Sequence, residues 1–592
     1  MRIPRPKKIW TRTVALAAAG TLTVGALAAC SDGSATATSD GSGTTTAEIS
    51  ATDNSGRSAQ DVLADNLSSD ETAALADQTW DTADEVAVTL DGDSASASGD
   101  GVTVDGSTVT ITQPGTYRIS GTLDDGQVVV DSSVDGVVRL VLDGADVTSS
   151  TGAAIDVQDA DQVSVVLADG STNRLEDAAE YADTTSDNAA NAALYSTADL
   201  AISGGGALDV VGNANDGITG KDGLVITSGT ITVDAADDAI RGKDYLVVSG
   251  GTIDVTAGGD GLKSDADDDA TAGYVALTGG DVTVDAGSDG VQGFTDVAIT
   301  GGTLTVTGSE EGVEAATIAV SGGDTDIIST DDGLNATVKE AEDDTATDDT
   351  TTDDTTDSTT DGTTDGTTDG DQQAQQEPPA DGEMPTGEPP ADGEMPEPPA
   401  DGEMPQGGGD GEMPQGGGGG APMDQVMAGA SITVTDGTLH VDAEGDGLDS
   451  NGVAEISGGT IVVEGPTNGG NGALDVAGAL DVTGGTLLAV GSSGMAEAPS
   501  EGSSQGWVAL TADSTLDAGT EVAVVDADGT QVATITLSKT AQSVVYTGPE
   551  ITDGDTYTLT ADGDEVGTAT AGEAPAGGMM PGGGQGGDQT AS

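Results

Sequence analysis

The chain has 592 residues, of which 105 are Asp or Glu and only 15 are Lys or Arg, giving a formal net charge of −90. This charge excludes nucleic acid as a partner, because phosphate binding needs clusters of Lys and Arg. The only histidine, His440, lies in an alternating strand segment and is expected to face outward, and the only cysteine, Cys30, is expected to carry a lipid. Ser-His and Cys-His schemes of nucleophilic catalysis therefore lack their parts.

Residues 1–30 have the features of a bacterial lipoprotein signal peptide. Five basic residues precede an apolar run over residues 14–26, which small residues and Cys30 follow. This order is typical of a secretory signal, and Cys30 occupies the position that is lipid-modified in lipobox sequences. We therefore expect a secreted lipoprotein, anchored through that lipid to the outer face of the bacterial cell membrane. Residues 31–84 are expected to be a flexible tether, because they begin rich in Ser, Thr, Gly and Asp.

A short phrase with a central acid recurs about every 22 residues between Asn215 and Asn335, and a Ser/Thr-Gly-Gly phrase keeps the same spacing. Between these phrases, runs such as residues 246–255 alternate apolar and polar side chains, which indicates strands. Self-similarity at this period is typical of a solenoid. We therefore predict an all-β parallel β-helix over residues 85–339 that resumes over 428–506, each rung burying its apolar face against the next.

Acids on successive rungs would lie about 4.8 Å apart and repel by about 1 kcal/mol per pair in water. Calcium suits such a ladder, because it takes about six to eight oxygen ligands from carboxylates, amides and carbonyls. The alternative is turn chemistry, since Asp before Gly favours tight turns. Several repeats carry two adjacent acidic or amide residues where a turn needs only one, so we predict at least one calcium site. Its candidate ligands are Asp216, Asp237, Asp238, Asp260, Asp265, Asp289, Glu311, Asp331, Asp332, Asp446, Asp449 and Asn451.

Four basic residues follow rung acids at fixed offsets: Lys221 and Lys243 by five residues, and Arg241 and Lys263 by three. On a β-helix they would form a short column of cations beside the carboxylates. The structural interpretation is ion pairing between rungs. The functional interpretation is substrate binding, or catalysis of β-elimination, in which calcium acidifies the proton beside a uronate carboxylate and a basic side chain removes it.

Three further segments complete the chain. Residues 340–427 are low-complexity sequence, rich first in Asp and Thr, then in Glu-Met-Pro repeats and then in Gly. They cannot bury a core, so we expect a disordered insert. Residues 507–573 alternate like strands and are expected to form a small β cap, because solenoids need caps over their terminal rungs. Residues 574–592 are expected to be a disordered, Gly-rich tail.

Several longer motifs resemble a known family. They are residues 114–121, 140–144, 215–218, 241–246, 260–265, 311–315, 446–452, 465–468 and 471–475. In this order they resemble the bacterial cell-surface carbohydrate-binding domain family, which has a right-handed parallel β-helix similar to that of pectate lyases. The resemblance covers most of residues 85–565 outside the insert. It implies binding of cellulose or polygalacturonate, calcium on the β-helix and no established catalysis.

Aromatic residues make up only 2% of the chain, so no linear platform for stacking sugars can be identified. We expect binding through Asp and Asn, with calcium bridging to acidic sugars, because a bare acidic surface would repel a polyuronate. The leading hypothesis is a lipid-anchored, extracellular polysaccharide-binding protein that is not an enzyme. The alternatives are a pectate-lyase-like uronate lyase and a surface adhesin or stalk that calcium stiffens.

Overall fold

The computed structural model describes residues 54–339 and 426–574, except residues 78 and 187. The predicted signal peptide, Cys30, the first part of the tether, the insert up to residue 425 and the tail from residue 575 lie outside the described residues. In the described ranges no helix is long and apolar enough to cross a membrane.

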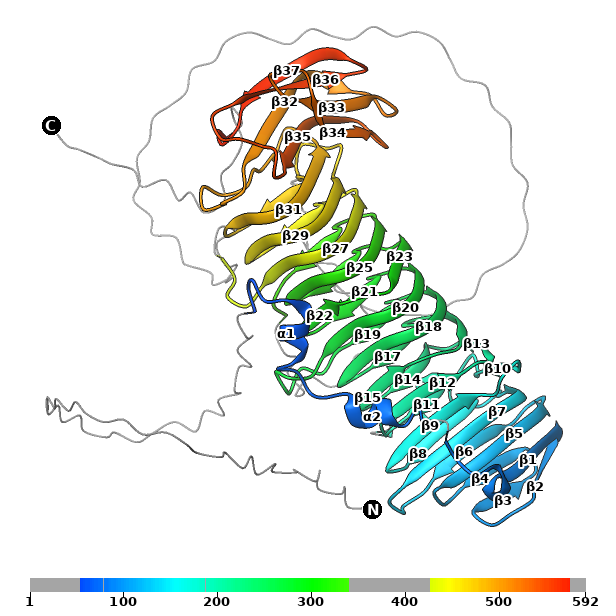
Figure 1. Cartoon of the computed structure of the whole chain (residues 1–592). Coiled ribbons are helices and arrows are strands. Elements are labelled where there is room, and N and C mark those ends of the chain that lie inside the picture. Colours follow the sequence, from blue (N-terminus) through cyan, green and yellow to red (C-terminus); the bar gives the residue numbers. More distant parts are fainter. Residues whose placement is uncertain (1–53, 78, 187, 340–425, 575–592) are drawn as a thin grey trace, which may run out of the picture. The chain divides into compact units, whose positions relative to one another are not determined.

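The described chain is nearly all β (Figure 1). One face of the solenoid is a thirteen-stranded sheet, here called the short-strand sheet, which is parallel except where β3 meets β4. Its strands, in order, are β3 (Val102–Asp105), β4 (Thr108–Ile111), β6 (Gln127–Asp131), β8 (Ile155–Asp159), β11 (Ala192–Ser196), β14 (Asp216–Gly220), β17 (Ile240–Gly242), β19 (Leu262–Ser264), β21 (Val291–Gly293), β24 (Val313–Ala315), β26 (Leu334–Ala336), β28 (Leu448–Ser450) and β30 (Leu474–Val476).

A twenty-stranded sheet forms the rest of each rung. Some long strands contribute to two faces of the β-helix. Strand β18, for example, pairs with β15 over its first residues and with β16 over its last. The strands are β1 (Val86–Gly92), β2 (Ser94–Ala97), β5 (Gly115–Leu123), β7 (Val137–Thr148), β9 (Gln162–Leu167), β10 (Thr172–Glu176), β12 (Leu200–Gly204), β13 (Ala207–Gly212), β15 (Gly223–Ile226), β16 (Thr230–Ala235), β18 (Tyr245–Ala257), β20 (Tyr274–Ala286), β22 (Asp296–Ile299), β23 (Thr303–Gly308), β25 (Thr317–Ser329), β27 (Ser431–Ala443), β29 (Val453–Glu464), β31 (Leu480–Gly491), β32 (Trp507–Leu516) and β35 (Ala541–Thr547). The predicted parallel β-helix is confirmed.

The Gly-Gly phrases lie at the corners of the rungs. Gly302 has φ +88°, and a Cβ there would lie 2.6 Å from the carbonyl oxygen of Gly280 on the preceding rung. Only glycine meets both conditions without strain. Inside the rungs, aliphatic side chains stack in register and are almost fully buried. In the short-strand sheet these are Ile218, Ile240, Leu262, Val291, Val313, Leu334, Leu448 and Leu474.

The ladder continues in register across residues 340–425. Strand β25 pairs with β27 and β26 pairs with β28, so that Leu334 lies opposite Leu448. After β31 the pairing becomes antiparallel through β35 and β32. A separate antiparallel sheet follows and shares one buried cluster with β31, β32 and β35, which confirms the predicted cap. Its strands are β33 (Glu521–Val525), β34 (Gln531–Thr536), β36 (Thr556–Ala561) and β37 (Asp564–Thr570).

The tether prediction needs correction over its described part. Residues 54–77, here called the N-terminal strap, contain helices α1 (Ala59–Leu63) and α2 (Asp70–Ala74) and pack along the β-helix (Figure 1). Val62 of α1 is fully buried against Ala298 and Ala319. A 3-10 turn (Thr82–Asp84) then leads into β1. The apolar side chains of the strap fill gaps on the outer surface of the β-helix, which composition alone does not reveal.

Candidate functional site

The recurring acids form one column at the turn before each short strand. The backbone N–H after each acid, as at Gly261 and Gly290, donates to the carbonyl of the corresponding acid on the next rung, here Asp289 and Glu311. Rungs therefore repeat at this turn with the same geometry. The column, here called the acid column, consists of Asp216, Asp238, Asp260, Asp289, Glu311, Asp332 and Asp446.

Several of these carboxylates serve the backbone. Oδ1 of Asp238 accepts the N–H of Asp260 at 3.0 Å, and Oδ1 of Asp260 accepts the N–H of Asp289 at 2.9 Å. Asp332 and Asp446 likewise accept N–H groups from the next rung. These four acids therefore bond the turn of the next rung, rather than their own turn as the alternative interpretation of the sequence had it.

A second column lies three residues further along the chain, in the middle of the short strands. Strand pairing places each member directly opposite the next. This set, here called the central column, runs Thr219, Arg241, Lys263, Gln292, Glu314, Asn335, Asp449 and Asp475. Its charge changes along the axis, from cations on the earlier rungs to carboxylates on the later ones.

On the earlier rungs the cations neutralise the acids. Nζ of Lys263 lies 3.2 Å from Asp238 and 2.7 Å from Asp260. Arg241 forms an ion pair with Asp265. Burial alone would lower the pKa of each cation, but the neighbouring carboxylates outweigh it and raise both pKa values. Arg241 and Lys263 are thus engaged in ion pairs between rungs.

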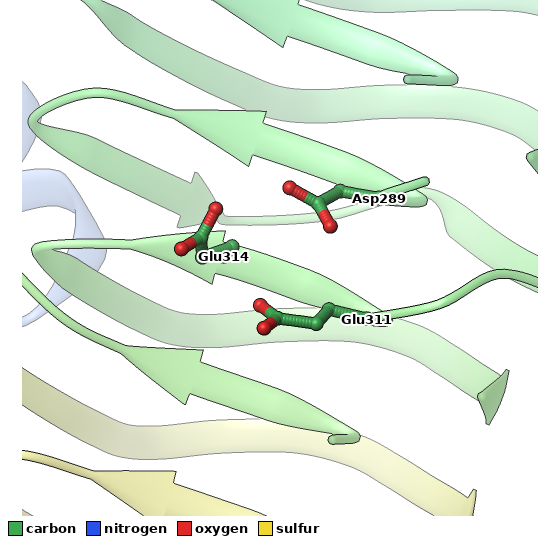
Figure 2. Close-up of side chains that lie close together, drawn as sticks. All are labelled: Asp289, Glu311 and Glu314. Carbon is green, nitrogen blue, oxygen red and sulfur yellow. The ribbon is translucent and has the colours of Figure 1, made fainter. Parts of the chain in front are cut away.

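On the next rungs three carboxylates converge without such an arrangement. Asp289 and Glu311 lie at successive turns of the acid column and Glu314 lies on β24, and their ligand oxygens are all within 4.8 Å of one another. Figure 2 shows the three side chains extending toward a common space. Asp289 and Glu314 are buried. We call this set the acidic triad.

Amides and one lysine hold the acidic triad. Nε2 of Gln292 donates to Asp289 at 2.7 Å and to Glu314 at 3.3 Å. Nδ2 of Asn335 donates to both oxygens of Glu311, at 3.0 and 3.1 Å. The ammonium of Lys339 forms an ion pair with Glu314. The partners orient the carboxylates, yet one lysine supplies one positive charge for three negative ones.

The pKa values of Asp289 and Glu311 reflect burial and this shortage of positive charge. Burial, followed by the charges of Asp260, Glu314 and Glu311, raises the pKa of Asp289. Burial and then Glu314 raise the pKa of Glu311 to about 8. These carboxylates hold protons more tightly than ordinary carboxylates do, so a bound cation would relieve an unfavourable interaction.

The triad fits a hard divalent cation. Two oxygens that each lie about 2.4 Å from one calcium ion are at most about 4.8 Å apart, and the ligand oxygens of the triad all lie within 4.8 Å of one another. Oδ1 of the neighbouring Asn335 is buried without a hydrogen-bond partner among the described residues. An amide oxygen is a ligand that calcium accepts. Asp289, Glu311 and Glu314 could therefore hold such an ion, with Asn335 beside them.

A wider group of acids continues beyond the triad. Burial, then the charges of Asp332 and Asp446, raise the pKa of Asp449 to about 9. Burial and then Asp475 raise the pKa of Glu497 to about 8. No Lys or Arg in the described ranges forms an ion pair with these five acids, so this end of the column is also deficient in cations.

The remaining residues that the sequence suggested as metal ligands or substrate-binding residues lie outside the acidic triad. Asp237 and Asp331 are exposed beside the acid column. Asn451 contributes its backbone, which donates to Ala336 and accepts from Met427. The pKa of Lys221 is lowered by burial and then by Arg241 and Lys243. Whether any of these residues binds a metal or a substrate stays a prediction.

Sequence reasoning missed Glu314, Gln292, Asn335 and Lys339. A signal for Glu314 was present, because the three-residue offset that singled out Arg241 and Lys263 also leads from Glu311 to Glu314. Lys339 carried no such signal, since it follows the last strand before the insert and shares no offset with other rungs.

Comparisons with known proteins give matches over part of the chain. Residues 105–355, which include the acidic triad, match the family model described as carbohydrate-binding domain-containing protein. A relative from Acetivibrio thermocellus with the same description is 44% identical over 126 residues, which make up 21% of this chain and 44% of the relative. The chain thus spans less than half the length of that curated relative.

A solved structure described as the polysaccharide lyase-like protein from C. thermocellum, gadolinium derivative, is 35% identical with a TM-score of 0.35, and the match covers 41% of this chain and 94% of that one. The family that this chain resembles over residues 105–355 is thus the carbohydrate-binding domain-containing family.

Proposed function

We propose that this protein binds an acidic polysaccharide of the polygalacturonate type, and that calcium held by the acidic triad is part of the binding surface. One observation supports this function above all: three carboxylates converge where the β-helix supplies too little positive charge. Residues 105–355 match a family model described as carbohydrate-binding domain-containing protein, which supports a carbohydrate as the class of ligand.

Calcium would neutralise the triad and, having more ligand positions than three carboxylates fill, would accept oxygens of the polysaccharide. Residues of this chain hold the carboxylates in place around the cation. Gln292 and Asn335 fix the orientation of the carboxylates, and the stacked rungs hold those residues in a rigid row. Without the cation, the same row would repel a polyuronate.

Polysaccharide binding is better supported than uronate lyase activity. Arg241 and Lys263 are engaged with carboxylates, which leaves Lys221, whose pKa is lowered, and Lys243 as the candidate bases. Lys221 follows Thr219, which is three rungs before Gln292. At about 4.8 Å per rung, this separates Lys221 from the triad by roughly 14 Å, and Lys243, which follows Arg241 on the next rung, by roughly 10 Å. A base at either distance cannot reach a sugar bound at the triad.

We further propose that lipid on Cys30 anchors the protein to the outer face of the bacterial cell membrane, as the signal sequence indicates. The Cys30→Ser variant would then move from the membrane fraction to the medium or stay as unprocessed precursor. Processed protein that remains in the membrane fraction would contradict the anchor.

The binding function is tested by retention of the full chain on insoluble polygalacturonate and on cellulose, with calcium or with a chelator, while the absorbance of unsaturated product is recorded. We expect retention on polygalacturonate that the chelator abolishes, and no product. The Glu311→Gln variant should lose at least about tenfold in retention. The matched control is Glu310→Gln, because Glu310 is the exposed neighbour of Glu311.

The other outcomes identify the alternatives. Product formation would support a lyase. A calcium-dependent rise in thermal stability without retention on either polysaccharide would support a stiffened adhesin or stalk. Equal losses in the Glu310 and Glu311 variants would show that the triad has no special role.

A further inference from the structure

A cavity of about 90 Å³ lies between the N-terminal strap and the β-helix. Asn54 and Asn66 of the strap and Phe294, Asp296 and Lys339 of the β-helix are among its lining residues. The strap lies outside the residues that match the family model, so the family match does not account for this cavity.

The buried carboxylate in the cavity wall is already satisfied. Asp296 is 3% exposed and accepts hydrogen bonds from Nδ2 of Asn54 at 3.1 Å and Nδ2 of Asn66 at 2.9 Å. Because both of its oxygens are engaged, Asp296 offers little to a cation. The other carboxylate of the lining, Asp65, forms an ion pair with Arg57 at 2.9 Å. Lys339 is thus the one cationic residue among the lining residues, and Phe294 is the one aromatic residue.

Lys339 connects the cavity with the acidic triad. Its ammonium forms an ion pair with Glu314, and Lys339 is also one of the residues that line the cavity. A divalent cation at the triad would repel this ammonium and compete with it for Glu314. The lysine would then need another anion, and the cavity is the space beside it.

We propose that the cavity takes the carboxylate-bearing edge of one uronate residue, and that a divalent cation at the acidic triad releases Lys339 from Glu314 to bind that carboxylate. This inference rests on the function proposed above. The ammonium supplies charge complementarity to a uronate, and Phe294 offers apolar contact to the sugar ring. The volume is below the roughly 300 Å³ of pockets that enclose a whole ligand, so the remaining sugars lie outside it.

Cation and uronate then strengthen each other's binding by the same factor, because coupling between two binding sites is reciprocal. Lys339 is the element that couples them. Its removal has opposite effects on the two ligands: calcium alone binds more tightly, because its competitor is gone, and uronate binds more weakly, because its counter-charge is gone. A lysine that only stabilises the fold would not produce effects of opposite sign.

The test uses calorimetric titration of the full chain and of its Lys339→Met variant, first with calcium alone and then with trigalacturonate in saturating calcium. We expect Lys339→Met to bind calcium at least about fivefold more tightly and trigalacturonate at least about fivefold more weakly. Fully methyl-esterified trigalacturonate should bind both proteins equally, because it lacks the carboxylates. Lys339→Arg, which keeps the charge, should retain binding of trigalacturonate.

The matched control is Lys539→Met, which removes the same charge from another ion-paired lysine, the partner of Asp442. It should change neither affinity. Unchanged calcium affinity in Lys339→Met, or an equal loss for the methyl ester, would overturn the inference. If the unmodified chain itself fails to bind polygalacturonate, the proposed function is overturned as well. If it binds and Lys339→Met binds equally, only this inference is overturned.

Discussion

Lys263 is the residue that most clearly shows how the rungs share charge. Its side chain is 22% exposed and lies between two nearly buried aspartates of successive rungs, Asp238 and Asp260. Removing the lysine would leave two buried carboxylates close together, and loss of one partner from a buried ion pair costs about 3–5 kcal/mol. This lysine therefore contributes to folding as an internal counter-ion.

We predict that Lys263→Met lowers the free energy of unfolding by about 3 kcal/mol, and that calcium restores part of the loss by replacing the missing positive charge. Thermal and denaturant unfolding with calcium and with chelator measure both effects. Lys243→Met is the control, because the ammonium of Lys243 has no carboxylate partner within the described ranges. A Lys263 variant as stable as the Lys243 variant would contradict the prediction.

At this scale the sequence predicts positions better than roles. Asp289 and Glu311 were identified from their place in the repeat, and the structure brings them together with Glu314. Asp238 and Asp260, which look the same in the sequence, accept backbone N–H groups and pair with Lys263. What separates the two groups is the residue three positions later, a cation in one case and an amide or acid in the other.

Among the elements, the N-terminal strap is the one that sequence reasoning misassigned. Its helices have only five residues each, too few to show a helical period. Their tertiary contacts are with residues far along the chain, such as the hydrogen bond between Thr72 and Tyr245, which are 173 positions apart. Such docking depends on the shape of a surface that exists only after the rungs have stacked.

We predict that Val62→Asp detaches the strap, because it places an unpaired carboxylate against Ala298 and Ala319. Trypsin should then cleave after Arg57 at least about tenfold faster, since about 1.4 kcal/mol of lost docking energy raises the open population tenfold. Val104→Asp, at a partly exposed position on β3, is the control. Cleavage after Arg57 at the same rate in both variants would contradict the assignment of the strap as a docked element.

At the scale of the whole molecule, the uneven distribution of cations along the β-helix makes stability depend on pH. Glu311 and Glu497 have pKa values of about 8 and Asp449 of about 9, against about 4 in an unfolded chain. A raised carboxylate pKa means that the folded state binds the proton more tightly than the unfolded state. Stability therefore falls as pH rises between these values.

We predict that in chelator the melting temperature falls steadily between pH 5 and pH 9, and that calcium removes most of this slope. His440 contributes in the same direction, because hydrogen bonding to Glu464 raises its pKa to about 9 and its stabilising charge is lost as pH rises. The His440→Gln variant isolates the carboxylate contribution. A melting temperature in chelator that is constant or rises over this range would contradict the prediction.

The fold itself was largely predictable, because one repeated pattern determines it many times over. Corner glycines, alternating apolar residues and the 22-residue period all specify the same rung. The ends were less predictable, because the repeat stops there: β1 and β2 form a hairpin, and β35 joins the long sheet in antiparallel fashion. Terminal rungs have only one neighbour, so their partners are specific to this chain.

The continuous register across residues 340–425 has a consequence for how the protein folds. The N–H of Asp446 bonds to Asp332 over a separation of 114 residues, whereas that of Asp260 reaches Asp238 over 22. Closing the longer loop costs only about 1.5 kcal/mol more, because loop entropy grows with the logarithm of length. This entropic cost is small compared with the stability of the folded β-helix. It must, however, be met in a single step, when the rungs before residue 340 first contact the rungs after residue 425. Rungs on each side can grow by adding neighbours, while this single junction must be found by a diffusive search, which makes it the natural slow step of folding.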